Sequence, residues 1–303
     1  MQQQVIEQAA PTREEFVARR ISGIGGSDAA TVCGLNPWKS AYELWLEKTR
    51  QIVPDDISDR EYIIWGNKLE PVIAERYEEV SGHKTIVRSQ LFRHPEHDWM
   101  IANIDRDTDD PLRMLECKTT NAFGVVNWGP TGTDQVPESY LLQCQHYLAV
   151  TGKQFCDLAV LIGGSDFRIY ELRRDDELIE ALIAREFAFW TMCKDMVAPP
   201  IDTKNPGAVD MLKRLYPGTN GVPVALPEEA NDWHKELEKI KADKKELETS
   251  EKVLKANLLA AMGEAPVGIL SDGGSYTRKV TERAGYVVNP CEYVDFRFKK
   301  AGK

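Results

Sequence analysis

Two acidic residues and a lysine in the segment NIDRDTDDPLRMLECKT, residues 103–119, have types and a spacing that could do chemistry. Asp105 ends one apolar, strand-like run. Glu116 and Lys118 lie in the next run, where strand alternation places both side chains on the same face. Two carboxylates that face one site repel each other, and Mg²⁺, which prefers oxygen ligands, relieves that repulsion. A lysine beside the metal can orient water and offset charge in a phosphorane-like transition state, so the pattern suits metal-assisted hydrolysis of a phosphodiester.

A hairpin is needed to bring the two acids together. We expect residues 101–105 to pair with residues 114–118, and the chain to turn through residues 107–111, which are rich in Asp and end in Pro. Such a hairpin would place Asp105 against Glu116. Taken alone, a Glu-x-Lys pair on a strand is also typical of a solvated face with a cross-strand ion pair, and this alternative stays open.

A further acid, Glu70, follows Trp65 and Gly66 on a predicted helix just before the strands. Its carboxylate is in a position to support a second cation at the site of Asp105 and Glu116, as in two-metal hydrolysis. The alternative is an acid on a solvated helix face.

Two glutamines lie in an otherwise apolar helix predicted over residues 137–151. Gln143 and Tyr147 are one turn apart and share a face, whereas Gln145 points elsewhere. Burying an unpaired amide is unfavourable, so we expect at least one glutamine to meet water, phosphate or an active-site group. The alternative is that both are exposed.

The segment RRISGIGGSD, residues 19–28, combines arginines, glycines and a serine at the expected start of a helix. Backbone N–H groups at a helix N-terminus attract anions, and Arg20 and Ser27 can add hydrogen-bond donors to a phosphate. The segment is neither a P-loop nor a dinucleotide fingerprint, because no strand is expected before it and no GK[ST] follows.

Composition sets the class of protein. The chain has 303 residues, 42% of them hydrophobic, which is enough for one main domain and an appendage. No apolar run approaches the roughly 20 residues of a membrane span, and the polar N-terminus predicts neither signal peptide nor anchor. Six scattered cysteines without a CxxC pair favour reduced thiols in a cytosol. A net charge of −10 argues against a nucleic-acid partner, although metal-neutralised acids and a local basic track are compatible with DNA.

Hydrophobic periodicity predicts helices on both sides of a set of strands. The expected helices cover residues 12–20, 28–35, 40–48 (amphipathic), 63–81, 137–151 and 176–196. The expected strands cover residues 85–92, 99–105, 114–119, 155–162 and 167–171. This order predicts a mixed α/β layer arrangement.

The C-terminal third has a different composition. Residues 198–227 are rich in Pro and Gly and predict a linker between a domain at residues 1–197 and an appendage at residues 228–303. The appendage begins with one charged helix, residues 228–262, that has a narrow apolar seam. We expect this helix either to pair as a hairpin or coiled coil, or to dock along one side of the main domain. Two segments complete a small β element, residues 268–281 and 286–298.

Four segments, in this order, resemble the YqaJ-type viral recombinases, which are phage nucleases of the lambda-exonuclease kind within the PD-(D/E)XK superfamily. The segments are RRISGIGGSDAATVCGLNPWKSAYELWLEK, WGNKLEPVIAERYEEVSG, ANIDR with LECKT, and YLLQCQHYLAVTG. The resemblance runs from about residue 13 to residue 190 and does not include the tail from residue 198 onward.

The resemblance implies a PD-(D/E)XK, restriction-endonuclease-like fold with a central mixed sheet flanked by helices, two Mg²⁺ or Mn²⁺ ions, and 5′→3′ digestion of one strand of duplex DNA. It also implies roles for seven residues: Asp105 and Glu116 as metal ligands, Lys118 as the catalytic lysine, Glu70 as the helix acid near the metals, Gln143 as the motif glutamine, and Arg20 with Ser27 as the grip on a 5′-phosphate. The family usually has glycine after the motif aspartate. This chain has Arg106 at that position. Its loop geometry and its path for DNA can therefore differ from those of the family.

The leading hypothesis is a Mg²⁺-dependent 5′→3′ exonuclease of a phage or prophage recombination system, acting on double-stranded DNA ends in the bacterial cytoplasm. Its product, a 3′ single-stranded overhang, would pass to a strand-annealing protein, and the family's ring-shaped trimers make a homo-oligomer an expectation. One alternative is an endonuclease on the same core. Another is a DNA-binding or assembly protein with an inactive site, and the intact set of Asp105, Glu116 and Lys118 argues against it.

Overall fold

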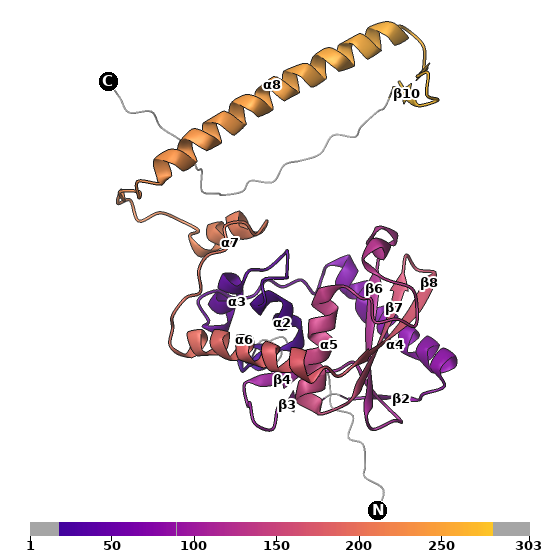
Figure 1. The fold of residues 1–303 in the computed structure, drawn as a ribbon. Helices are drawn as coiled ribbons and strands as arrows, with labels where there is room; N and C mark the ends of the chain where they lie inside the picture. Colours follow the sequence, from indigo (N-terminus) through magenta and orange to yellow (C-terminus); the bar gives the residue numbers. More distant parts are fainter. Residues whose placement is uncertain (1–17, 89, 281–303) are drawn as a thin grey trace, which may run out of the picture. The chain divides into compact units, whose positions relative to one another are not determined.

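The computed structural model describes residues 18–88 and 90–280 of the chain (Figure 1). It contains two compact units, Met1–Leu215 and Tyr216–Lys303, with the boundary inside the predicted linker. Most of the predicted helix at residues 12–20 and the predicted strand at residues 286–298 lie outside the described residues.

A five-stranded mixed sheet forms the centre of the first unit, in the order β2-β5-β6-β7-β8. Strands β6 and β7 run parallel, and every other neighbouring pair in this sheet is antiparallel. The mixed sheet that the sequence predicted is therefore confirmed. Its strands are β2 (Thr85–Val87), β5 (Arg106–Thr108), β6 (Arg113–Thr120), β7 (Phe155–Ile162) and β8 (Asp166–Arg173).

A second, three-stranded sheet corrects several of the predicted strand boundaries. It consists of β1 (Ile24–Gly25), parallel to β4 (Met100–Ala102), which is antiparallel to β3 (Phe92–Arg93). The predicted strand at residues 85–92 is therefore two strands in two different sheets. The strand preceding the glycine-rich helix start, which the sequence did not predict, is β1. The partner of β6 in the predicted hairpin is β5, and not the segment that ends at residue 105.

Helices cover both faces of the five-stranded sheet (Figure 1). Helix α4 (Glu61–Ser81) packs through Ile73, Ala74 and Tyr77 against the side chains of β6 and β7 that point to its face. Helix α5 (Glu138–Thr151) lies on the opposite face, in the larger apolar core. Both helices end where Gly82 and Gly152 take a left-handed backbone conformation, with φ of 81° and 71°. Glycine adopts this conformation without strain.

Further helices of the first unit are α2 (Gly26–Val32), α3 (Ala41–Lys48), the 3₁₀ helix η1 (Ala122–Asn127) and α6 (Asp176–Lys194). Of these, α2 and α6 pack against α5. Helix α3 starts where the Ser40 hydroxyl accepts a hydrogen bond from the Glu43 amide, as a helix cap does. The sequence predicted that α3 is amphipathic. Its last six residues are nevertheless all buried, and α2 and α6 pack against it.

Helix α7 (Ala208–Leu215) lies in the segment that was predicted to be a linker. Ala208 and Met211 are buried, and Met211 belongs to the main apolar core. Arg214 forms ion pairs with Glu43 (2.9 Å) and Asp55 (3.2 Å) in the first unit. The core of the first unit thus extends beyond residue 197, where the sequence placed its end.

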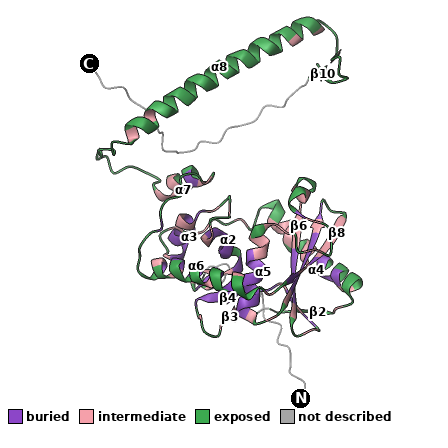
Figure 2. Cartoon of the chain, viewed as in Figure 1, coloured by how far each residue is buried: buried purple, intermediate pink, exposed green. Residues whose placement is uncertain are grey.

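The second unit contains one long helix and a short hairpin. Helix α8 (Ala230–Met262) has no buried residue within the described part of the chain, as the green ribbon in Figure 2 shows. Most residues of its apolar seam are exposed, including Trp233 at 63% and Leu247 at 70%. Strands β9 (Val267–Ile269) and β10 (Ser275–Thr277) pair antiparallel. Which surface the seam packs on stays a prediction.

Two further observations concern the cysteines and the hydrophobicity of the helices. The five cysteines in the described residues are free thiols. Among the same residues, no helix is both long and apolar enough to span a bilayer.

Met211→Ala should lower the free energy of unfolding of the full chain by about 2–5 kcal/mol, the usual range for truncating a buried methionine. Val209→Ala on the same helix is the matched control, because Val209 is 63% exposed, and it should change stability by less than about 0.5 kcal/mol. Urea unfolding of the two variants measures the difference. Equal, small effects would show that α7 is not part of the core.

Candidate active site

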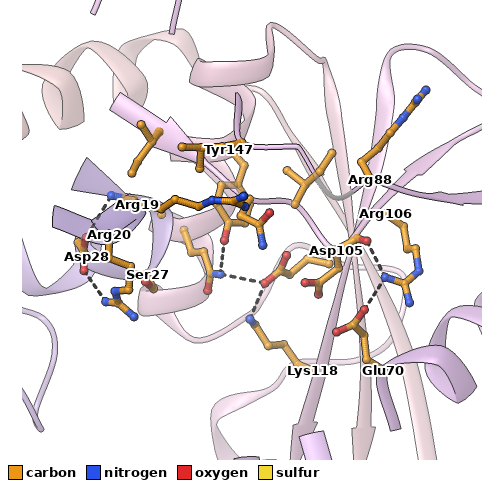
Figure 3. A pocket seen from close by; sticks show the side chains of 18 of the residues that line it. Arg19, Arg20, Ser27, Asp28, Glu70, Arg88, Asp105, Arg106, Lys118 and Tyr147 are labelled. Atoms are coloured by element: carbon orange, nitrogen blue, oxygen red, sulfur yellow. Dashed lines mark hydrogen bonds and ion pairs between the residues drawn. The ribbon is translucent and has the colours of Figure 1, made fainter. Parts of the chain in front are cut away.

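A cavity of about 690 Å³ opens between the sheet, α2, α4 and α5. Arg20 and Ser27 lie at one end of it, and Glu70 and Arg106 at the other, with Lys118 and Asp105 between them (Figure 3). All seven residues that the sequence proposed for the site line this cavity: Arg20, Ser27, Glu70, Asp105, Glu116, Lys118 and Gln143.

Strand β6 positions Glu116 in the middle of the sheet, opposite Leu158 of the parallel strand β7. Glu116 is only 2% exposed. Its Oε1 atom accepts hydrogen bonds from Lys118 Nζ (2.5 Å) and Gln143 Nε2 (2.8 Å). Its Oε2 atom is buried and has no hydrogen-bond partner within the described residues.

Asp105 reaches the same site from the residue just before β5. Its Oδ2 atom accepts a hydrogen bond from the Cys117 backbone N–H (2.8 Å), which fixes the carboxylate against β6. Burial, together with the negative charge of Glu116, raises the pKa of Asp105 to about 7. The two acids therefore repel each other across the site, as the sequence pattern predicted.

The site keeps Lys118 positively charged. Burial opposes the charge on this amine, but attraction by Glu116 and Asp105 outweighs it and raises the pKa of Lys118 above its ordinary value. The ammonium also lies over the ring of Tyr140, at 5.1 Å from the ring centre. Lys118 is therefore a donor at this site and not a base.

The donor set fits a divalent cation. A buried carboxylate oxygen without a partner is energetically unfavourable, and a cation beside it would supply the missing interaction and relieve the repulsion between Asp105 and Glu116. Glu70 is engaged differently, because its carboxylate accepts a hydrogen bond from Arg106. Among the described residues, no three His, Cys, Asp or Glu side chains are gathered as a ligand set. Asp105 and Glu116 are therefore the residues that would hold a metal.

The two glutamines of helix α5 point in different directions, as their spacing predicted. Gln143 Nε2 donates to both Glu116 and the hydroxyl of Tyr147 (2.9 Å). Gln145 points away from the cavity, donates to the Arg173 carbonyl (2.7 Å) and accepts from the Asp175 amide (3.1 Å). Both glutamines are buried and paired, so the exposed alternative is wrong, and Gln143 contacts Glu116 in the candidate site.

A buried charge network, which sequence reasoning missed, holds the glycine-rich turn. Asp28 accepts from Arg20 (3.0 Å) and from Lys48 (2.6 Å), and Lys48 also donates to the carbonyls of Arg20 and Gly23. Burial opposes ionisation of Asp28, but Lys48 and Arg20 hold its pKa well below the usual range. The signal available in the sequence was weak, because Lys48 ends a helix and looks like an ordinary surface lysine.

Gly26, the first residue of α2, has a steric role. A Cβ atom on Gly26 would lie 2.4 Å from the ring of Tyr147, so that only glycine lets α2 and α5 approach this closely. Because Tyr147 also contacts Gln143, this approach links the Arg20 end of the cavity to the acidic end.

A mixed sheet flanked by helices, with two acids and a lysine around adjacent strands, defines the PD-(D/E)XK nuclease fold. Two solved structures of an alkaline exonuclease from Laribacter hongkongensis share the fold. One matches with a TM-score of 0.50 and 22% identity, covering 61% of this chain and 94% of that chain. The other, in complex with dAMP, also has a TM-score of 0.50 and 22% identity, covering 66% of this chain and 96% of that chain.

Sequence comparison defines the family. The model of the YqaJ-like viral recombinase domain matches residues 15–154. The protein YqaJ of Bacillus subtilis (strain 168) is 37% identical over 268 residues, which cover 86% of this chain and 82% of YqaJ. The chain belongs to the YqaJ-like viral recombinase family.

Asp105→Asn should stabilise the metal-free protein at pH 8 and have little effect at pH 4. The pKa of Asp105 in the folded protein, about 7, lies above the ordinary value of 3.8. The folded state therefore binds this proton more tightly than the unfolded state, and stability falls as pH rises through this window. The loss should be on the order of 2–4 kcal/mol. Urea unfolding in EDTA from pH 4 to pH 8 measures it, and parallel curves for variant and parent would contradict the assignment.

Proposed function

We propose that this protein is a nuclease that depends on Mg²⁺ or Mn²⁺ and digests one strand of duplex DNA from its 5′ end. The observation that carries the proposal is the unpartnered Oε2 atom of Glu116, buried beside Asp105 and in the same cavity as Lys118. A cation held by Asp105 and Glu116 would polarise the scissile phosphate and lower the pKa of an attacking water.

The chain's own residues supply the remaining functions. Lys118, which stays protonated, can donate to the attacking water or to a phosphate oxygen as negative charge develops. Gln143 holds the Glu116 carboxylate in a fixed orientation, since it bonds the same oxygen as Lys118. Arg20 and Ser27, which line the far end of the cavity, would bind a terminal 5′-phosphate while an internal phosphate lies near Asp105.

The proposal extends to the biological setting. Removal of the 5′ strand leaves a 3′ single-stranded overhang, which is the substrate of a strand-annealing protein in a phage or prophage recombination system. We propose that the enzyme works on DNA ends in the bacterial cytoplasm, and as a homo-oligomer such as a ring-shaped trimer. Membership of the YqaJ-like viral recombinase family supports this setting.

Asp105→Ala and Glu116→Ala should each abolish cleavage of linear duplex DNA in Mg²⁺, because each removes an oxygen ligand. Lys118→Ala should reduce turnover by about 10²-fold or more and DNA affinity much less. Lys213→Ala, at a lysine whose side chain is 65% exposed, is the matched control. Cleavage in Mg²⁺, Ca²⁺ and EDTA measures the metal dependence, and Ca²⁺ should support binding with little cutting.

Linear and closed circular DNA, treated in parallel, separate the candidate activities. An exonuclease leaves the circle intact, whereas an endonuclease opens it. Near-normal cleavage by any variant of the acidic pair or of Lys118 would defeat the site assignment.

Arg20→Ala should slow digestion of 5′-phosphorylated ends by about tenfold or more, because each charge-assisted hydrogen bond contributes about 1.5–3 kcal/mol. On 5′-hydroxyl ends the effect should be much smaller. The turn should survive the change, since Asp28 keeps its bond to Lys48. Rates on both substrates, for the parent, Arg20→Ala and Arg20→Lys, test the claim. An equal loss on both kinds of end would make Arg20 a general DNA contact or a structural residue.

A further inference from the structure

Arg106 and Glu70 form an ion pair at the acidic end of the cavity. Arg106 Nη1 donates to Glu70 Oε1 and also to the Asp105 carbonyl (2.6 Å). The Arg106 side chain is 10% exposed and the Glu70 side chain 31% exposed. Strand β5 holds the arginine rigidly, because it pairs with β2 at Val87 and with β6 at Leu115.

Two further acids line the cavity besides Asp105 and Glu116. Asp28 is bonded to Arg20 and Lys48 at the far end, and Glu70, next to Asp105, is bonded to Arg106. If Glu70 were to bind a cation, its bond to Arg106 would have to break or be shared. The guanidinium would then lie unpaired, largely out of water, and close to a divalent positive charge. Removing the partner of a poorly solvated charge is strongly unfavourable, and like charges at short range add to the penalty.

The geometry points to a single divalent cation at this site, held by Asp105 and Glu116, with Arg106 in place of a second cation as the partner of Glu70. This inference rests on the proposed function and departs from the two-ion arrangement that the sequence resemblance implies. Arg106 is then a positioning residue. It neutralises Glu70, and its bond to the Asp105 carbonyl fixes the backbone of the residue whose carboxylate would hold the metal.

The residues that bond Glu116 and the Glu70–Arg106 ion pair lie on different sides of the site. Lys118 and Gln143 bond Glu116 on the side of the cavity that faces α5. Glu70 and Arg106 lie together at the other side of Asp105 (Figure 3).

Counting bound Mn²⁺ on the full chain without DNA tests the inference, by calorimetry and by the electron paramagnetic resonance signal of free Mn²⁺. The parent should bind one Mn²⁺ per chain. Glu70→Gln, which keeps the shape and one hydrogen bond to Arg106, should also bind one, more weakly than the parent because the charge of Arg106 is then uncompensated. Asp105→Asn should lose the bound ion, which shows that the counted site is this one.

Removing the arginine should create the second site. Arg106→Ala frees Glu70 and should bind two Mn²⁺ per chain, and the double variant Arg106→Ala/Glu70→Gln should return to one. Arg106→Lys, which keeps the charge, should stay at one. If Arg106→Ala does not fold, as judged by circular dichroism, the comparison of the parent with Glu70→Gln still decides.

Two Mn²⁺ in the parent, falling to one in Glu70→Gln, would overturn the inference and leave the proposed nuclease intact. A folded Arg106→Ala protein that gains no second ion would also overturn it. A parent chain that binds no Mn²⁺ would overturn both the inference and the proposed metal dependence.

Discussion

The rest of this site depends on the burial of one carboxylate, that of Glu116. Glu116 lies in the middle of a strand that is covered on both faces, where an ionised acid is stable only if charge and hydrogen bonds compensate for lost water. Lys118 and Gln143 compensate on one oxygen and leave the other without a partner. Burial of Glu116 in the sheet therefore strongly favours positive charge next to its carboxylate. The positions of the neighbouring residues follow from this constraint.

Helix α5 positions Gln143, one of the partners of Glu116. Buried contacts fix this helix on two sides. His146 bonds Glu186 of α6 (2.9 Å) through one ring nitrogen and the Ile101 carbonyl (2.9 Å) through the other, with both side chains fully buried. On the cavity side, Gly26 lets α2 pack directly on Tyr147. A helix held in this way cannot slide or rotate without leaving buried charges unpaired, so Gln143 is kept in register with Glu116.

Local periodicity was sufficient to predict much of this arrangement. Alternation along β6 put Glu116 and Lys118 on one face, and the four-residue spacing on α5 separated Gln143 from the second glutamine. Features that depend on distant contacts were not predictable. Lys48 is an ordinary surface lysine in sequence, and only the tertiary fold buries it beside Asp28. The Pro- and Gly-rich composition around α7 hid a helix that contributes Met211 to the core. The central fold and the acidic pair were therefore accessible from sequence, whereas the strand boundaries and the charge network around the turn were not.

The parallel pairing of β6 and β7 has a consequence for how the site was assembled. Parallel neighbours cannot be joined by a tight turn, so the chain must leave the sheet and return between them, and here it does so through η1 and α5. The helix that supplies Gln143 is thus the connection itself. One continuous stretch, from Arg113 to Ile162, carries the glutamate, the lysine and the glutamine, while Arg20 and Ser27 come from a distant segment. The residues proposed for catalysis, apart from Asp105, and those proposed for the DNA end therefore lie on separate segments of the chain, so a change of sequence in one segment leaves the other intact.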